Sequence, residues 1–361
     1  MRLFQNSGLY PRYLKIFNSR HSEQYTFSER LQAFLNDRFG ALHFLLPVLE
    51  SDPNAFFTNG DDAILQRAWA RENNLPTKIS LEDILLAQLE SHQTEVFYNL
   101  DPVRYGSNFV RRLPSCVKKT VCWRAAPSPG ADFSEYDRVV CNFPSIIESW
   151  QKQGWHGAYL TPAYDPVMDE YASSEERPID VLFIGGYSRH HIQRSETLES
   201  VSQLALSYRV SYHIDMSRIT RLANSPLGLL PGVLRHRMPS NVKRITSEPV
   251  FGRELYRLMS QAKIILNGAI DMAGEDRGNM RCFEALGCGA LMMSDHGHYP
   301  SGFVNGNTML TYRNADDAAV QTAQVLNDWE QSKNIAKRGN TMIRNNFSKS
   351  VQWKMFQDLL G

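Results

Sequence analysis

Short apolar runs alternate along the chain with longer segments in which apolar and polar residues mix. Three runs in the first half have the length of strands, namely Glu95–Leu100, Lys119–Trp123 and Arg138–Asn142, and helix-sized segments separate them. Within 27–50, in contrast, apolar residues recur every three or four positions, as on one face of a helix. This alternation of strands and helices predicts a parallel, doubly wound sheet.

A second series of such elements begins at Ile179. The preceding segment, 162–178, has the polar, proline-containing composition of a linker. A chain of 361 residues also exceeds what one hydrophobic core usually supports. We therefore expect an α/β protein with two doubly wound, Rossmann-like domains, over residues 1–170 and 179–345, and a final helix within 346–361.

The stretch from 262 to 295 is the most informative part of the second series. An apolar strand, Ala262–Leu266, leads through a polar loop into a short helix near Gly278, which ends at glycines before the apolar run 290–293. The start of such a helix faces the edge at which parallel strands end. Its backbone N–H groups favour an anion, so we expect a diphosphate to bind at Gly278, Asn279 and Met280.

Charged side chains around this helix start complete a candidate nucleotide-binding site. Arg277 and Arg281 flank the start with positive charge, which suits the negative charge that grows on a departing diphosphate. Glu284 lies one turn further along, where a carboxylate can accept two hydrogen bonds from a ribose diol. We therefore predict phosphate contacts for the two arginines and a ribose contact for the glutamate.

The same stretch resembles the C-terminal core of group 1 glycosyltransferases with the GT-B fold, and especially the branch similar to bacterial spore-maturation proteins. Resemblance covers residues 180–358 well and the N-terminal half in outline. It implies two Rossmann-like domains that face a cleft, a nucleotide-sugar on the second, an acceptor on the first, and a last helix that returns to the first domain. The residues that carry it follow the pattern N-x-R-x-F-E-A-x-x-C-G-A, and here they are Asn279, Arg281, Phe283, Glu284, Ala285, Cys288, Gly289, Ala290 and, after the apolar run, Asp295.

Related retaining enzymes have two glutamates with seven residues between them. Asp276 and Glu284 have this separation here, although the first position is an aspartate. The resemblance therefore implies retention of configuration, with Asp276, Arg277 and Arg281 as the catalytic residues. An inverting enzyme would instead need a carboxylate base beside the acceptor, for which Asp101 is the candidate.

Three other segments are candidates for contacts to the donor. The strand that begins at Ile179 runs into Gly185 and Gly186, which we interpret as a glycine-rich turn that allows close approach of the ligand. Two arginines follow it and can neutralise phosphates. The resemblance also implies that the loop before residue 252 packs on the nucleobase through backbone groups. The residues concerned are Gly185, Gly186, Arg189, Arg194, Pro249 and Phe251.

The acceptor site is expected where the strands of the first domain end. Asp101 follows one strand, and Trp123 with Arg124 ends the next; an aromatic face suits a sugar ring and a guanidinium suits an anion. The resemblance adds Gly8, in the loop after the first strand. Each of these residues also fits an ordinary loop position, so the acceptor site rests on their convergence.

Charge and composition exclude several other classes of protein. The formal net charge is +1, with 39 basic and 38 acidic residues, which provides no general field for binding nucleic acid. Five cysteines show no paired metal-ligand spacing and indicate a reducing compartment, so we expect a cytoplasmic protein with no metal cofactor. No apolar run reaches the roughly 20 residues of a membrane span. The basic tract 218–244 is interpreted as a solvated loop, with peripheral contact to acidic lipid at the inner face of the membrane as the alternative.

We conclude from the sequence that the protein is a metal-independent glycosyltransferase of the hexosyltransferase type, with a nucleotide-sugar donor and a saccharide, lipid-linked saccharide or protein acceptor. Biosynthesis of cell-surface polysaccharide is the expected role. A sugar-nucleotide epimerase of the same fold is one alternative, and a GT-B-like scaffold or partner protein without catalysis is another. Arg277, Arg281 and Glu284, present together, favour a working donor site over a scaffold.

Overall fold

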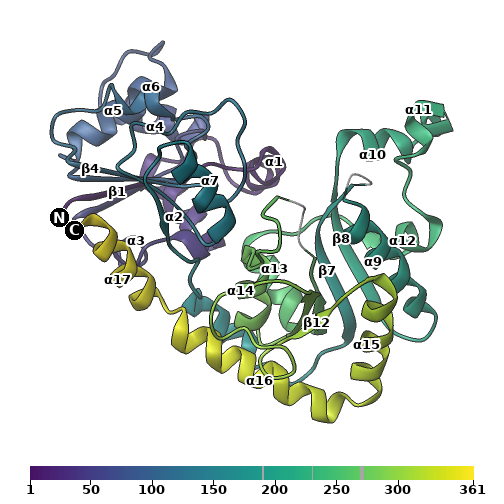
Figure 1. The fold of residues 1–361 in the computed structure, drawn as a ribbon. Helices are drawn as coiled ribbons and strands as arrows, with labels where there is room; N and C mark the ends of the chain where they lie inside the picture. The colour runs from purple at the N-terminus through teal and green to yellow at the C-terminus, as the bar shows by residue number, and fades with distance from the viewer. Residues whose placement is uncertain (189–190, 230, 269–271) are drawn as a thin grey trace. The chain divides into compact units, whose positions relative to one another are not determined.

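The computed structural model of the chain describes residues 1–188, 191–229, 231–268 and 272–361 (Figure 1). It contains two compact units. Unit 1 comprises Met1–Pro162 together with Lys349–Gly361, and unit 2 comprises Ala163–Ser348. Arg189, a predicted phosphate contact, lies outside the described residues.

Unit 1 is built on a six-stranded sheet in which all neighbouring strands are parallel. The three apolar runs that predicted strands form β3, β4 and β5, so the predicted parallel sheet is confirmed. In spatial order the strands are β2 (Ala55–Thr58), β1 (Leu3–Asn6), β3 (Val96–Asn99), β4 (Lys119–Trp123), β5 (Arg138–Cys141) and β6 (Gly157–Tyr159).

Local sequence explains where the helices of unit 1 begin and end. Thr26 forms a capping box with Glu29 at the start of α2, which ends at Asp37 because Arg38 adopts left-handed backbone angles. Ser80 caps α5 by accepting the N–H of Asp83. The helices of this unit are α1 (Pro11–Arg20), α2 (Phe27–Asp37), α3 (Leu46–Leu49), α4 (Ala63–Glu72), α5 (Leu81–Ser91), α6 (Ser107–Val110), α7 (Pro144–Lys152) and α17 (Lys349–Leu360).

Helix α17 packs on the body of unit 1 through buried polar contacts. Lys349 is 3% exposed, and its ammonium group donates to the carbonyls of Ala41 at 2.7 Å and Phe44 at 2.8 Å. Gln352 donates to the carbonyls of Leu42 and Thr161. Three of the four accepting carbonyls, those of Ala41, Leu42 and Phe44, lie in the segment that follows α2.

Unit 2 has the strand order of dinucleotide-binding domains. Its parallel sheet runs in the spatial order β12 (Leu310–Tyr312), β11 (Leu291–Asp295), β10 (Ala262–Leu266), β7 (Ile179–Tyr187), β8 (Val210–Met216) and β9 (Thr246–Ser247). Counted from β7, the order is 3-2-1-4-5-6, which reverses direction between β7 and β10. Ligands of such sheets bind beyond the carboxyl ends of the strands at this switch point.

Helices cover the sheet of unit 2 (Figure 1) and enclose an apolar core. The core joins inward-facing residues of β7, β8, β10 and β11 to α9 and α15. The helices are α8 (Asp169–Ala172), α9 (Ile192–Ser202), α10 (Arg218–Ala223), α11 (Pro231–Leu234), α12 (Ser240–Arg244), α13 (Gly252–Ser260), α14 (Met280–Gly287), α15 (Ala315–Asn327) and α16 (Trp329–Asn346); short 3-10 turns are η1 (Ala41–His43), η2 (Pro166–Met168), η3 (Gln203–Leu206) and η4 (Pro226–Leu229).

Two sequence predictions for unit 2 are wrong. Gly185 and Gly186 do not form a turn; they lie inside β7 and pair with Ile214 and Asp215 of β8. The reason is that β8, which the sequence reading omitted, extends the ladder past the glycines. The basic tract 218–244 is largely helical rather than a loop, since it contains α10, η4, α11 and α12.

Candidate nucleotide-binding site

At the switch point of unit 2, a hydrogen bond connects α9 to the loop after β10. Arg194, in the first turn of α9, donates from Nη2 to the carbonyl of Gly268. Because α9 follows β7 and Gly268 follows β10, this arginine spans the two strands at which the order reverses. The sequence placed Arg194 among the phosphate contacts, and the structure places its guanidinium at the expected edge.

Asn267 forms hydrogen bonds to several elements at this edge, a role that was not predicted from the sequence. Its buried amide donates to Ser294 Oγ at 3.0 Å and accepts from Asn279 Nδ2 at 3.3 Å. Its backbone carbonyl accepts from the Tyr312 hydroxyl at 2.6 Å. One residue therefore ties together the ends of β10, β11 and β12 and the start of α14, and its only sequence signal was an asparagine directly after an apolar strand.

Helix α14 begins at this edge, as the sequence predicted. Gly278 has a φ of 119°, which favours glycine, and Asn279 is the N-cap residue. The Asn279 side chain is directed to Asn267 and caps no N–H group of the helix. The partial positive charge of the helix start is thus not neutralised by a capping side chain.

Arg277 does not stand free beside the helix start, because its Nε is paired with Asp295 at the end of β11. The guanidinium also donates to the carbonyl of Gly274 at 2.8 Å. Gly297 allows this arrangement, since a Cβ there would lie 2.6 Å from Cγ of Arg277. The arginine is 13% exposed and the aspartate 5%, so the pair is largely withdrawn from water and its geometry is fixed.

Arg281 and Glu284 form a second buried pair on α14, through Nη1 and Oε2. Burial raises the pKa of Glu284 and the guanidinium of Arg281 opposes this shift. The second carboxylate oxygen, Oε1, makes no hydrogen bond to any residue that the structure describes. Glu284 thus keeps one acceptor atom available while Arg281 holds its orientation.

The remaining predicted donor residues lie at separate positions on unit 2. Asp276 is half-buried and its backbone bridges to His298, which fixes the loop before α14.

Gly185 lies against the ring of Phe183, where a Cβ would be 2.9 Å from the nearest ring atom, whereas a Cβ on Gly186 would have only the Asp215 carbonyl near it, at 3.8 Å. Pro249 and Phe251 precede α13, with the proline buried and the phenylalanine half-buried.

The predicted acceptor residues all lie in unit 1, where they fall into two groups. Gly8 and Asp101 follow β1 and β3 and are in contact, since a Cβ on Gly8 would lie 3.0 Å from the Asp101 side chain. Trp123 is 9% exposed and packs on His43, with ring centroids 4.4 Å apart. Its face is therefore not open to a sugar, which corrects the stacking role expected from sequence. Arg124 donates to Ser128 Oγ at 2.6 Å.

Asp61 joins Gly8 and Asp101, and sequence reasoning missed it. Its Oδ2 accepts the N–H of Leu9 at 2.9 Å and lies 3.9 Å from Arg104, which also pairs with Asp101. Its Oδ1 is buried and makes no hydrogen bond to the described residues. Burial raises the pKa of Asp61 to about 6, and the nearby Asp101 adds to the shift. The signal in the sequence was its position just after the strand Ala55–Thr58.

Comparison with known proteins agrees with this geometry. Residues 230–356, which include α14 and both arginine–carboxylate pairs, match the family model described as glycosyl transferase-like. The chain matches no curated protein by sequence.

Several solved structures share the fold. HepE of Anabaena, in complex with UDP and glucose, has a TM-score of 0.61 at 11% identity over 99% of this chain and 98% of its own. A glycosyltransferase from Rickettsia africae has a TM-score of 0.56 at 10% identity, with the same coverage of both chains. TarM has a TM-score of 0.55 at 9% identity, over 78% of this chain and 58% of its own. The protein thus has the fold of GT-B glycosyltransferases, and its residues 230–356 match the glycosyl transferase-like family.

Proposed function

We propose that the protein is a glycosyltransferase that transfers a sugar from a nucleoside diphosphate sugar to a hydroxyl group of a saccharide acceptor. One observation carries the proposal: the start of α14 and the buried pair Arg281–Glu284 lie at the carboxyl edge of a dinucleotide-type sheet, inside the region that matches the family. The match of the pattern from Asn279 to Asp295 further favours the branch similar to spore-maturation proteins.

The donor is proposed to bind with its diphosphate at the start of α14 and its ribose at Glu284. Oε1 of Glu284 is the available acceptor atom for a ribose hydroxyl. HepE has been solved with UDP and with UDP-glucose, and TarM of S. aureus with UDP, which favours uridine as the nucleoside here. The backbone around Pro249 and Phe251 is the proposed contact for the base.

Departure of the nucleoside diphosphate breaks the bond between the anomeric carbon and a phosphate oxygen, and the electron pair stays on that oxygen. Arg194, Arg277 and the α14 start are proposed to stabilise this charge, so that no metal ion is needed. Asp295 holds Arg277 in place, which removes the cost of ordering the side chain during the reaction.

Retention of configuration is proposed from the spacing of Asp276 and Glu284. The acceptor hydroxyl then bonds to the anomeric carbon on the face that the diphosphate leaves, and its proton passes to the released phosphate oxygen. Gly8, Asp61 and Asp101 are proposed to bind acceptor hydroxyls, because Oδ1 of Asp61 is buried without a partner in the described part of the chain.

Binding and turnover test these proposals separately. UDP and a panel of UDP-sugars should raise the midpoint of thermal unfolding, because a ligand that binds only the native state stabilises it. Release of UDP from the stabilising donor should continue in EDTA. A failure of all nucleotides to shift the midpoint would refute the donor site; loss of turnover in EDTA, with recovery in magnesium or manganese, would refute the metal-independent mechanism alone.

A further inference from the structure

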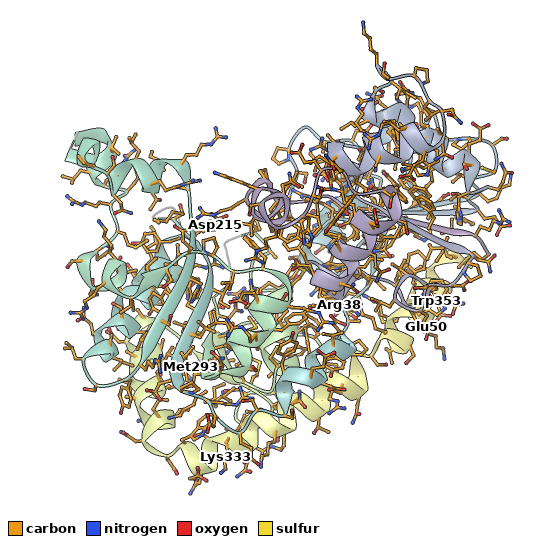
Figure 2. All side chains as sticks on the ribbon, turned by 180° about the vertical axis from the view of Figure 1, so that it is seen from behind. Arg38, Glu50, Asp215, Met293, Lys333 and Trp353 are labelled. Atoms are coloured by element: carbon orange, nitrogen blue, oxygen red, sulfur yellow. The ribbon has the colours of Figure 1, made fainter. Side chains whose placement is uncertain are left out.

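The described residues of the segment 217–238, namely 217–229 and 231–238, form an arm that projects from the carboxyl edge of the unit 2 sheet (Figure 1). The arm contains α10, η4 and α11 and follows β8, whose residue Asp215 is labelled at its base in Figure 2. Asn224 closes the base, since its Oδ1 accepts the N–H of Met238 at 3.1 Å. Thr220 and Ala223 of α10 are buried, and Ser217 caps this helix. The arm is therefore a folded element with a defined outer face.

The charge of the arm has one sign. It contains four arginines and no aspartate or glutamate, and residues 216–247 as a whole contain no acidic side chain. The arm thus carries +4 in a chain of net charge +1, so the rest of the chain carries −3. All four arginines, Arg218, Arg221, Arg235 and Arg237, are exposed. Arg235 donates to His236, and within the described residues no carboxylate pairs with any of the four.

Large apolar side chains are also exposed on the arm. Ile219 and Leu222, three residues apart on α10, are 39% and 41% exposed, and Leu234 on α11 is 46% exposed. On α10 the exposed positions are Arg218, Ile219, Arg221 and Leu222, so arginine and apolar side chains alternate on the side that faces water. Exposed apolar side chains next to arginines are typical of segments that lie in the interface of a bilayer.

We propose that the arm binds a membrane surface that contains anionic phospholipid, with its arginines at the phosphates and Ile219, Leu222 and Leu234 in the interface. The charge is complementary to such a surface, and the apolar side chains distinguish it from a soluble polyanion, which would leave them in water. Because β8 is parallel to β7 and β10, the arm projects from the edge that carries the candidate nucleotide-binding site. This binding does not depend on the proposed transfer reaction.

Co-sedimentation of the full chain with lipid vesicles tests the proposal. Vesicles with 30% phosphatidylglycerol in phosphatidylcholine should bind the protein at least about a hundredfold more strongly than phosphatidylcholine alone at 0.1 M NaCl, because each arginine near an anionic surface contributes to binding. Binding should fall, but persist in part, at 0.5 M NaCl. Hydrogen exchange should slow in 217–238 when vesicles are added.

Two variants separate charge from apolar contact. Replacement of the four arm arginines by glutamine should abolish the preference for phosphatidylglycerol, whereas the double variant Ile219→Ser/Leu222→Ser should lose the part of binding that resists 0.5 M NaCl. The matched controls change exposed residues of unit 2 outside the basic tract 218–244: Arg209, Arg313, Lys337 and Arg338 to glutamine, or Val304 and Val320 to serine. Both controls should bind as wild type does.

Several results would overturn the proposal. One is that the folded wild type does not bind vesicles, and another is that the arm and control variants lose binding equally. A third is that Ile219→Ser/Leu222→Ser binds vesicles as wild type does, while the protein binds soluble polyphosphate as strongly as vesicles. The last result would assign the arm to a soluble polyanion. If the arginine variant does not fold, the salt series on wild type and the serine variant still decide the question.

Discussion

Replacement of Glu284 by glutamine tests the candidate nucleotide-binding site most directly. The change keeps the size of the side chain but removes the charge that pairs with Arg281 and the charged acceptor proposed for the ribose. A hydrogen bond to a charged group contributes about 1.5–3 kcal/mol, so loss of one such bond should weaken UDP binding by about tenfold to 150-fold.

The same substitution also has a cost in stability, which follows from the burial of the pair. Breaking a fully buried ion pair costs about 3–5 kcal/mol. Arg281 is 21% exposed and can turn toward water, so we expect a smaller loss of about 1–3 kcal/mol. For a unit of this size, that loss lowers the unfolding midpoint by several degrees, about 2–4 °C per kcal/mol.

Calorimetric titration with UDP, below the unfolding midpoint of each variant, measures the affinity. Arg281→Gln is the matched control, because it breaks the same pair and leaves the carboxylate. Loss of the guanidinium should raise the pKa of Glu284 further, so this variant should bind UDP more weakly as the pH is lowered, whereas Glu284→Gln should show no such dependence. If folded Glu284→Gln binds UDP as tightly as wild type, the ribose assignment is wrong.

Three further predictions concern other residues. Asp276→Asn should lower turnover more than it weakens UDP binding, and equal losses in the two assays would contradict a role near the transferred sugar. The pKa of Asp61 is raised to about 6, so its charge destabilises the native state above that pH. In urea unfolding, Asp61→Asn should therefore raise the free energy of unfolding by about 1–3 kcal/mol at pH 7.5 and by almost nothing at pH 4. An equal increase at the two pH values would contradict this account. Burial lowers the pKa of His43 to about 3, so the neutral imidazole contributes to stability above pH 6.5, and this contribution falls as the pH is lowered toward 3. Between pH 7 and pH 5, the free energy of unfolding in urea should fall by about 2 kcal/mol more for wild type than for His43→Gln.

The fold could be predicted where local pattern and tertiary structure agree. The runs that form β3, β4 and β5 are buried strands bounded by polar residues, and the glycines around α14 fix both ends of that helix whatever packs on it. β8 was missed because its residues, Val210–Met216, do not form a continuous apolar run; they alternate apolar and polar positions, which is the pattern of a strand with one buried face. Its partner Gly185–Gly186 was then assigned to a turn, since glycine pairs are more frequent there than in strands.

Side-chain partners in the candidate site could not be predicted in the same way. Arg277 and Arg281 were correctly placed at the start of α14, but their carboxylate partners depend on distances that sequence spacing alone does not define. The packing of Trp123 on His43 brings together positions 80 residues apart in the chain. Trp123 is therefore part of the core, although the sequence predicted that its ring would stack on a sugar. Asp61 was overlooked because its altered pKa arises from burial and from Asp101, a residue of another strand end.

The contacts of α17 have a consequence for the synthesis of the protein. Unit 1 consists of residues 1–162 and 349–361, so the ribosome makes all of unit 2 before it makes the helix whose Lys349 binds the carbonyls of Ala41 and Phe44. Until then, those carbonyls and the surface beneath α17 have no partner from this helix. The packing of unit 1 therefore cannot be completed until after all of unit 2 has been made, although residues 1–162 are made first.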